Sequence, residues 1–282
     1  EIASCLVGSE MCIRDRNTGL GVPRSLVKSF LGRTTPDAGH FLPSRRLISE
    51  SCYPRNRRAR LIALEVARVV DMEIFGFTAG PFQTNTYVIA EGRRAFIVDP
   101  GMDAMARVLE HDLDYEAIVL THGHIDHTRD AGTLAERLDI PVYIHPADQF
   151  MLESGEGVSL QAQELFDAAH MTPIADVREL HEGESLELLG HNFSLKHAPG
   201  HSPGCTMIVS EEFALTGDVL FAGAIGRTDL PHSDAQAMQK SLAGPVWSLA
   251  DNLTLLPGHG PTTTMRKERA TNPFFATLRE VL

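Results

Sequence analysis

Residues 121–127 read Thr121-His122-Gly123-His124-Ile125-Asp126-His127, so three imidazoles and one carboxylate follow one another closely. The apolar run 117–120 directly before them has the composition of a buried strand. Neutral imidazole and carboxylate groups are ligands that suit zinc and similar divalent metals. Because adjacent side chains point in different directions, they do not all reach one tetrahedral ion. The segment predicts a metal-binding loop, and a solvated, histidine-rich turn is the alternative for this loop alone.

Three further residues of the same chemistry stand singly in glycine-flanked turns that follow predicted strands. They are His201 in residues 198–204, Asp218 in residues 216–218 and His259 in residues 257–260. A glycine beside a ligand lets the backbone approach an ion closely. Each residue by itself would be an ordinary histidine or aspartate. Their repeated setting, together with the histidine-rich loop, predicts one shared site.

Working outward from this loop, short apolar runs punctuated by Gly, Pro and Asn predict strands at 72–78, 86–90, 95–98, 117–120, 142–144, 185–189, 193–196, 206–209, 213–215 and 253–256. Helical periodicity predicts helices at 103–111, 130–138, 235–249 and 274–282, with a less regular helical stretch at 146–171. Two groups of strands, each followed by helices, predict two packed sheets with helices on their outer faces. We therefore expect an α+β protein with a four-layer αββα sandwich.

The first part of the chain differs from the rest in charge and composition. Residues 1–71 contain 12 Lys and Arg against 7 Asp and Glu, whereas residues 72–282 contain 13 against 30, so the formal charges are +5 and −17. Residues 1–71 are rich in Arg, Pro and Ser, and residues 4–16 resemble translated adapter sequence. We expect 1–71 to be a disordered or artefactual extension, 72–282 to be the domain, and the native chain to start near Met72.

Composition narrows the class of protein and its partners. No run of eighteen apolar residues occurs in the chain, which argues against a membrane-spanning helix. Cys205 is the one cysteine in residues 72–282, so a disulfide framework is excluded there, and a buried, inert thiol in a reducing cytoplasm is expected. The strongly negative domain would repel a phosphate backbone, which argues against nucleic acid as a partner.

The HxHxDH run at 122–127, followed in order by His201, Asp218 and His259, resembles the metallo-β-lactamase superfamily over residues 72–282. The resemblance implies that the first metal is held by His122, His124 and His201. It implies that the second metal is held by Asp126, His127 and His259. Asp218 would then bridge the two metals.

Four short segments outside the ligand set resemble those of small glyoxalase II-like hydrolases, which cleave thioesters. The segments are Ile97-Val98-Asp99-Pro100-Gly101, 197–201, 226–229 and 272–274. The β-lactamases of the superfamily that use a cysteine ligand do not match, because this chain has Asp218 at the position of that cysteine. Flavodiiron-type members replace the second histidine of the run with glutamate, and His124 argues against them. The resemblance thus implies a small-molecule thioester, such as a hydroxyacylglutathione, as the substrate.

Two cations that share a water lower its pKa toward about 7 and supply a bridging hydroxide at neutral pH. We expect two zinc ions per chain, with iron or manganese as other candidates, and direct attack by the hydroxide without a covalent enzyme intermediate. Asp126 is the candidate catalytic residue, because it would both coordinate the second ion and orient the hydroxide.

Two other functions remain open at this point. A persulfide dioxygenase-like enzyme of the same fold would hold one Fe(II) with a set such as His122, His201 and Asp218. A non-catalytic member would use the fold for binding, although all seven ligand positions are filled here. Metal stoichiometry separates the hydrolase from the dioxygenase.

Several residues outside the ligand set carry weaker expectations. Asp99 either holds a ligand imidazole by its other nitrogen or only forms a turn before Pro100. Arg227 and Asp229 are expected to pair. Structural roles are expected for His145 and His197, surface positions for His40, His111, His170, His181, His191 and His232, and a solvated helix face for Arg266, Lys267 and Arg269.

Overall fold

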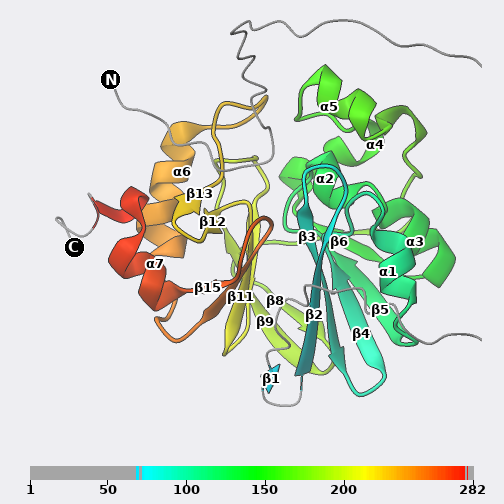
Figure 1. Cartoon of the computed structure of the whole chain (residues 1–282), viewed down its shortest axis with the longest axis horizontal. Coiled ribbons are helices and arrows are strands. Elements are labelled where there is room, and N and C mark those ends of the chain that lie inside the picture. Colours follow the sequence, from blue (N-terminus) through cyan, green and yellow to red (C-terminus); the bar gives the residue numbers. More distant parts are fainter. Residues whose placement is uncertain (1–67, 70–71, 277, 279–282) are drawn as a thin grey trace, which may run out of the picture. The chain divides into compact units, whose positions relative to one another are not determined.

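Two β-sheets face each other in the computed structural model, which describes residues 68–69, 72–276 and 278 (Figure 1). The first sheet has the order β1-β2-β3-β4-β5-β6-β7. Its strands are β1 (Arg68–Val69), β2 (Met72–Ala79), β3 (Thr84–Glu91), β4 (Arg94–Val98), β5 (Asp114–Val119), β6 (Val142–Ile144) and β7 (Val177–Glu179). Pairing is antiparallel from β1 to β4 and parallel from β4 to β7.

The second sheet has the order β15-β14-β11-β10-β9-β8 and comes entirely from the later part of the chain. Its strands are β8 (Ser185–Leu188), β9 (His191–His197), β10 (Thr206–Val209), β11 (Phe213–Gly217), β14 (Thr254–Pro257) and β15 (Thr263–Thr264). A separate two-stranded pair consists of β12 (Leu220–Phe221) and β13 (Ala224–Ile225). Each large sheet is therefore built from one continuous part of the sequence.

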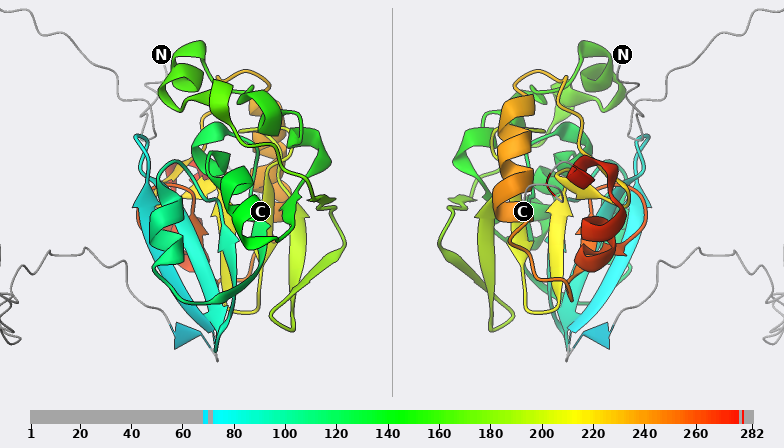
Figure 2. Two further views of the ribbon diagram at one scale, coloured as in Figure 1. Left: turned by 90° about the vertical axis from the view of Figure 1, so that its right-hand side faces the viewer. Right: turned by 90° about the vertical axis from the view of Figure 1, so that its left-hand side faces the viewer.

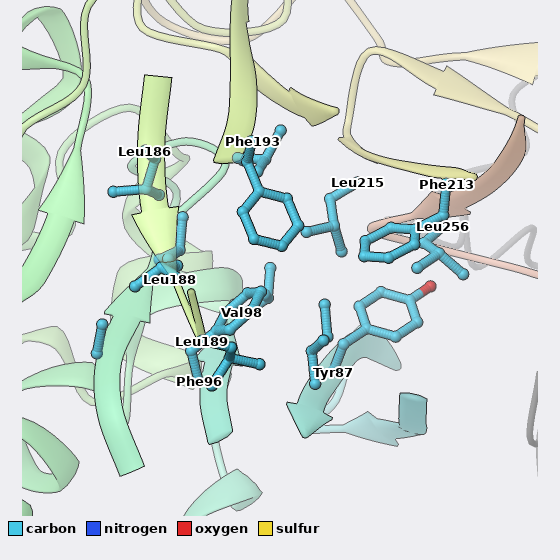
Figure 3. Packing of buried hydrophobic residues seen from close by; sticks show 14 of the residues in the cluster. Tyr87, Phe96, Val98, Leu186, Leu188, Leu189, Phe193, Phe213, Leu215 and Leu256 are labelled. Carbon is cyan, nitrogen blue, oxygen red and sulfur yellow. The ribbon is translucent and has the colours of Figure 1, made fainter. Parts of the chain in front are cut away.

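Strand β4 shows why the sheets pack in layers. Its apolar run is buried on both faces, and alternate side chains point to opposite sides. Phe96 and Val98 lie in the cluster between the sheets, whereas Ala95 and Ile97 lie in the cluster beneath the outer helices. Figure 3 shows the cluster between the sheets, in which the Phe96 and Phe193 rings meet edge to face with centroids 5.5 Å apart.

Helices cover the outer face of each sheet and complete the four layers (Figure 2). Helices α1 (Ala104–Leu109) and α3 (Ala131–Leu138) pack on the first sheet through residues such as Val108 and Leu134. Helices α6 (Ala235–Ser241) and α7 (Met265–Thr271) pack on the second sheet through Met238 and Met265. The predicted α+β class and αββα sandwich are confirmed.

The predicted stretch 146–171 is helical but broken into short pieces. These are the 3-10 turn Pro146–Asp148, α4 (Met151–Ser154), α5 (Leu160–Leu165) and the 3-10 turn Ala168–His170. Gly155 and Gly157 separate α4 from α5, and both have a positive φ that interrupts a helix. Among the described residues no helix is long and apolar enough to cross a membrane.

The helix predicted at 235–249 is shorter in the structure, and one helix near the end of the chain was missed. Helix α6 continues only as a π-helical turn, Leu242–Val246, because Pro245 lacks the N–H that a regular helix needs. Helix α7, which Thr264 caps by accepting from Lys267 N, was not predicted. Within the predicted helix 274–282, Phe274 and Phe275 belong to a 3-10 turn, and residues 276 and 278 are helical. Residues 277 and 279–282 lie outside the described residues.

The predicted extension over residues 1–71 lies outside the described residues, apart from β1. Strand β1 pairs with β2 through Arg68↔Glu73 and Val69↔Met72, so the first sheet includes two residues before Met72. The boundary at Met72 stays a prediction.

Candidate metal centre

The histidine-rich loop follows the carboxyl end of β5, an interior strand of the first sheet. Residues 120–128 are all buried, and the short helix α2 (Ile125–Thr128) begins directly after His124. Asp126 and His127 therefore lie within α2, while His122 and His124 lie in the loop before it. The change from loop to helix within one short segment points neighbouring side chains in different directions, as the sequence predicted.

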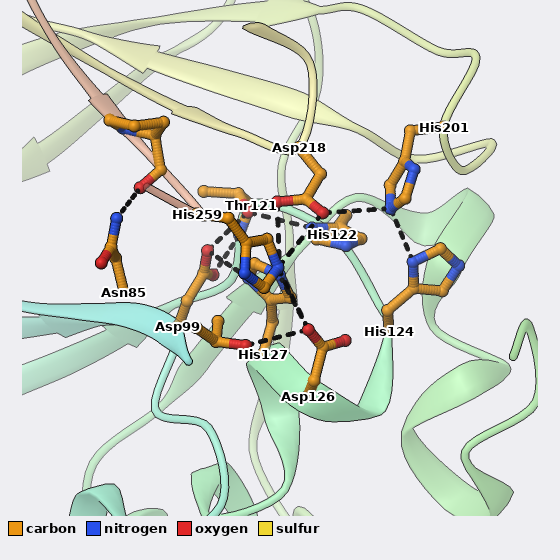
Figure 4. A network of polar contacts seen from close by, with 12 residues as sticks. Asn85, Asp99, Thr121, His122, His124, Asp126, His127, His201, Asp218 and His259 are labelled. Atoms are coloured by element: carbon orange, nitrogen blue, oxygen red, sulfur yellow. Dashed lines mark hydrogen bonds and ion pairs between the residues drawn. The ribbon is translucent and has the colours of Figure 1, made fainter. Parts of the chain in front are cut away.

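The other three predicted ligands follow strands of the second sheet. His201 lies in the connection between β9 and β10, Asp218 directly after β11, and His259 two residues after β14. Strands β11 and β14 are parallel, so their carboxyl ends meet at one edge, where Gly258 N donates to Gly217 O at 2.8 Å. The site therefore lies at the ends of strands from both sheets, and each sheet contributes part of it (Figure 4).

Three histidines form the first group of potential ligands. The ligand atoms of His122, His124 and His201 all lie within 4.8 Å of one another, and His124 Nδ1 is 2.9 Å from His201 Nε2. The second group is Asp126, His127 and His259, which meets the same limit. In that group His259 Nε2 lies 3.2 Å from Asp126 Oδ2 and 3.3 Å from His127 Nε2.

Asp218 lies between the two groups. Its Oδ2 is 3.4 Å from His201 Nε2 in the first group, and its Oδ1 is 3.4 Å from His127 Nε2 in the second. Asp218 Oδ2 also lies 3.5 Å from His259 Nε2. The structure thus brings all seven residues predicted from the sequence together, as two groups of three with Asp218 between them. Their role as metal ligands stays a prediction.

The hydrogen-bond partners of the rings fix which nitrogens carry lone pairs. Thr121 Oγ1 donates its one hydrogen to Asp99 Oδ2 at 2.6 Å, so it accepts from His122 Nδ1 at 3.1 Å. His127 Nδ1 donates to Asp99 Oδ2 at 3.0 Å, and His201 Nδ1 donates to the Arg227 carbonyl at 2.9 Å. In the neutral rings, Nε2 of all three histidines is therefore an acceptor.

These acceptors fit a divalent cation. His122 Nε2 and Asp218 Oδ1 are buried, and neither has a hydrogen-bond partner. Buried polar atoms in proteins are normally paired, and ligand histidines normally give their other N–H to a carboxylate or carbonyl. His127 and His201 give their other N–H to a carboxylate and a carbonyl in this way, and metal ions in the space between the two groups would supply the missing partners of His122 Nε2 and Asp218 Oδ1.

The acid–base properties of the site point the same way. Burial, with repulsion from neighbouring histidines, lowers the pKa of His122 well below its usual range and that of His124 to about 3. Burial opposes ionisation of Asp126 and Asp218, but the neighbouring imidazoles outweigh it and lower both carboxyl pKa values. At His127 burial lowers the imidazole pKa, but the carboxylates of Asp126 and Asp218 outweigh burial and raise this pKa well above its usual range.

His259 behaves like His127. Burial lowers the pKa of its imidazole, but Asp218 and Asp126 outweigh that effect and raise it. The site therefore combines two ionised carboxylates with two imidazoles that favour a positive charge. A divalent metal bound here would displace protons from His127 and His259.

Sequence reasoning missed two residues of β3 that support this site. Thr84 Oγ1 donates to Asp126 Oδ2 at 2.9 Å, and Thr84 forms an isolated β-bridge with His259. Asn85 Nδ2 donates to the carbonyls of Pro257 and Gly260, both at 2.9 Å. The available signal was a polar run at the start of an otherwise apolar strand.

The weaker sequence predictions had mixed outcomes. Asp99 has a positive φ of 48° and also accepts from His127, so it both forms a turn and supports a candidate ligand. The rings of His145 and His197 stack with centroids 4.1 Å apart, which agrees with structural roles. Arg227 pairs with Asp229 at 2.6 Å.

Two sets of residues were expected at the surface, and each is exposed only in part. His170 and His232 are exposed as expected, but the described histidines His111, His181 and His191 are half-buried, and His40 lies outside the described residues. Arg266 and Lys267 are exposed on α7. Arg269 is half-buried instead and binds Asp251 at 2.8 Å, because its long side chain packs over the Trp247 ring.

The model of the Metallo-beta-lactamase superfamily matches residues 79–259, which include all seven candidate ligands. The chain belongs to this superfamily. Members of the superfamily are metal-dependent hydrolases and bind divalent metals. The family resemblance predicted from the sequence is confirmed.

The chain is similar to known proteins and solved structures over about seven tenths of its length. The hydroxyacylglutathione hydrolase GloC of Haemophilus influenzae is 37% identical over 213 residues, which cover 73% of this chain and 98% of GloC. The crystal structure of BLEG-1 B3 metallo-beta-lactamase matches with a TM-score of 0.65 and 34% identity, covering 72% of this chain and 99% of that one. The crystal structure of TTHA1623 in a di-iron-bound form matches with a TM-score of 0.62 and 39% identity, covering 71% of this chain and 99% of that one.

Proposed function

We propose that this chain is a binuclear metal-dependent hydrolase that cleaves a thioester of a small thiol, of the hydroxyacylglutathione class. The observation that carries the proposal is the position of Asp218 between the two groups, since its carboxylate lies 3.4 Å from His201 of the first group and 3.4 Å from His127 of the second. The name of the GloC relative supports the substrate class. Two ions, if held by these residues, would supply a nucleophilic water at neutral pH and polarise the substrate carbonyl.

The protein's own residues would hold and orient these groups. His122, His124 and His201 would hold the first ion, and Asp126, His127 and His259 the second. Asp126 is the proposed catalytic residue, because its carboxylate borders the space between the groups and its Oδ2 is fixed by Thr84. We propose zinc as the metal, since imidazole and carboxylate ligands suit it, with iron or manganese as alternatives.

The nearby hydroxyl and thiol groups argue against a covalent enzyme intermediate. Ser202 is fully buried, and its Oγ donates to the equally buried Asp148 Oδ2 at 2.5 Å, so its hydroxyl serves an internal contact and is not open to a substrate. Cys205 is buried, and burial raises the pKa of its thiol far above neutrality. Water is therefore the proposed nucleophile, and trapping of an acyl-enzyme by rapid quench would contradict this step.

Metal content and thioester hydrolysis, measured on the same sample, test the proposal. We expect about two zinc per chain and turnover of S-lactoylglutathione. His259→Ala should lose about one ion per chain and most of the turnover. The matched control is His170→Ala, an exposed histidine whose removal should change neither.

Two other outcomes would reassign the protein. One iron per chain, with oxygen uptake on glutathione persulfide and no hydrolysis, would place it with the dioxygenases. Hydrolysis of a β-lactam but not of a thioester would instead align it with the activity that BLEG-1 is named for. A fully metallated protein that hydrolyses no thioester, lactone or phosphoester would support a binding role.

A further inference from the structure

A buried carboxylate outside the ligand set lies beside the three-histidine group. Asp148 has no exposed surface and lies at the end of the 3-10 turn that follows β6. Its Oδ2 accepts from Gly123 N at 2.9 Å and from Ser202 Oγ at 2.5 Å. Its Oδ1 accepts from Gly204 N at 2.6 Å. One side chain thus receives three hydrogen bonds from two distant loops.

These two loops are the ones that carry the three histidines. Gly123 lies between His122 and His124, and Ser202 directly follows His201. The first loop follows a strand of the first sheet, and the second loop connects two strands of the second sheet. Asp148 therefore joins the two sheets at the place where their ligands must come within reach of one ion.

Two glycines, Gly123 and Gly204, pack closely against Asp148. A Cβ at Gly123 would lie 2.7 Å from the Asp148 carbonyl oxygen, and a Cβ at Gly204 would lie 2.6 Å from Asp148 Cγ. Such separations are far shorter than van der Waals contact, so both positions need glycine. The close approach of the two loops to Asp148 depends on these missing side chains.

The segment that carries Asp148 is itself fixed to the second sheet. The His145 and His197 rings stack with an interplanar angle of 3°, and His197 Nε2 donates to the Pro203 carbonyl at 2.8 Å. His145 Nδ1 accepts from Ala147 N at 3.2 Å, which holds the 3-10 turn. Asp148 is thereby held from both directions and has little freedom to follow a displaced loop.

We propose that Asp148 is a positioning residue for the three-histidine group, which fixes His201 relative to His122 and His124 and so sets the affinity of that group for a metal ion. The inference rests on the proposed function in one respect, because it takes these histidines as metal ligands. Residues that orient metal ligands typically change metal affinity by about 10- to 100-fold when they are altered.

Asp148→Asn is the sharpest variant, because it keeps the size of the side chain and removes acceptor capacity. An amide has one acceptor oxygen and one NH2 donor. If the NH2 replaces Oδ1 it meets Gly204 N–H, and if it replaces Oδ2 it meets Gly123 N–H. One loop must therefore move away from residue 148 in either orientation.

Glu268→Gln is a matched control in another part of the fold. Glu268 is also fully buried and accepts three hydrogen bonds, from Gly223 N at 2.7 Å, Thr263 Oγ1 at 2.6 Å and Asn272 Nδ2 at 2.9 Å. None of these donors is a candidate ligand or its neighbour in sequence. Both variants should lower the unfolding temperature, but only Asp148→Asn should change metal binding.

The experiment measures metal retention against a graded series of chelator concentrations in the full-length protein, with the absorption spectrum of the cobalt-substituted protein and the unfolding temperature. We expect Asp148→Asn to lose one of two ions at about 10- to 100-fold lower chelator concentration and to alter the cobalt bands. Ser202→Ala, which removes one donor and leaves both glycines, should show a smaller shift in the same direction. It also keeps the test available if Asp148→Asn does not fold.

Equal metal retention in wild type, Asp148→Asn and Ser202→Ala would overturn the inference. Metal loss that tracks the unfolding temperature equally in Asp148→Asn and Glu268→Gln would also overturn it. The proposed function is judged separately on turnover by the wild type. A wild type that binds two ions without hydrolysing a thioester would contradict that function and leave the inference on Asp148 intact.

Discussion

Thr84 Oγ1 donates a hydrogen bond to Asp126 Oδ2 at 2.9 Å, although the two residues are 42 positions apart. The bond connects the first residue of β3 to a candidate ligand in α2. Thr84 also bridges to His259, so one residue of the first sheet contacts two members of the second ligand group. The orientation of Asp126 therefore depends on β3 as well as on its own helix.

Thr84→Val should lower turnover about 10-fold while the protein stays folded, because valine keeps the shape and removes the donor. Thr84→Ser retains the hydroxyl and should keep turnover near that of wild type. Steady-state kinetics with metal content measured in parallel would check this. Equal turnover in the valine and serine variants would exclude an orienting role for the hydrogen bond.

Asp99→Asn should weaken the second metal position, because Asp99 Oδ2 accepts from His127 Nδ1 at 3.0 Å. Asparagine tolerates the positive φ of 48° at this position, so the backbone turn should persist and the effect should be electrostatic. We expect a loss of affinity of about 10- to 100-fold for one ion, measured by competition with a chelator. Retention of both ions at wild-type affinity would contradict the role assigned to Asp99.

Metal-free protein should be most stable near pH 6.5, the ordinary imidazole pKa. The folded-state pKa values of His127 and His259 are raised, so their stabilising effect is complete below about 6.5 and is lost as the pH rises. The folded-state pKa values of His122 and His124 are lowered, so the stabilisation that their neutral rings contribute is lost as the pH falls below about 6.5. Denaturant unfolding of chelator-treated protein, measured at about every pH unit from 5 to 9, should show a maximum in the free energy of unfolding.

Metal binding should become tighter as the pH rises through the same range, since the ion displaces protons from His127 and His259. Calorimetry in buffers of different ionisation enthalpy would report the released protons. Binding that is independent of pH would show that these imidazoles are already unprotonated in the metal-free protein.

Gly258→Ala should abolish binding at the second position and reduce binding at the first. An added Cβ would overlap Asp218 Oδ1 and would lie 2.6 Å from His127 Cε1. Gly244→Ala is the matched control, because a Cβ there meets no atom within 4 Å. Elemental analysis of both variants distinguishes a local clash from a general effect of replacing glycine.

Phe96→Ala should cost about 3–5 kcal/mol in free energy of unfolding, because it opens a cavity between the sheets. Phe96 is fully buried and packs against Phe193 in the cluster shared by both sheets. Urea denaturation gives the change, and the folded fraction should still bind two ions. A loss below about 1 kcal/mol would show that the sheets repack around the missing ring.

The candidate ligands could be predicted from sequence because each follows an apolar strand and stands in a recognisable local setting. Asp148 and Asn85 could not be predicted in this way. Asp148 bonds to Gly123 and Ser202, which lie 25 and 54 positions away, and Asn85 bonds to Pro257, 172 positions away. Nothing local to these residues reports such partners, because only the packing of the two sheets creates them.

The errors in secondary structure have a similar cause. Strands β12 and β15 have two residues each, too few for a periodic pattern, and they form because neighbouring strands offer hydrogen-bond partners. Helix α7 was not predicted, because its sequence MRKERAT has one large apolar side chain, Met265, and therefore no apolar periodicity.

The sequential origin of the two sheets has a practical consequence. The first sheet ends at Glu179 and the second begins at Ser185, so a break between them would leave four candidate ligands on one fragment and three on the other. Neither fragment would carry a complete three-histidine group, and Asp218 would be separated from His127. High-affinity metal uptake would then report directly on reassembly of the two fragments, and a metal ion would act as a removable cross-link between the two halves of the gene product.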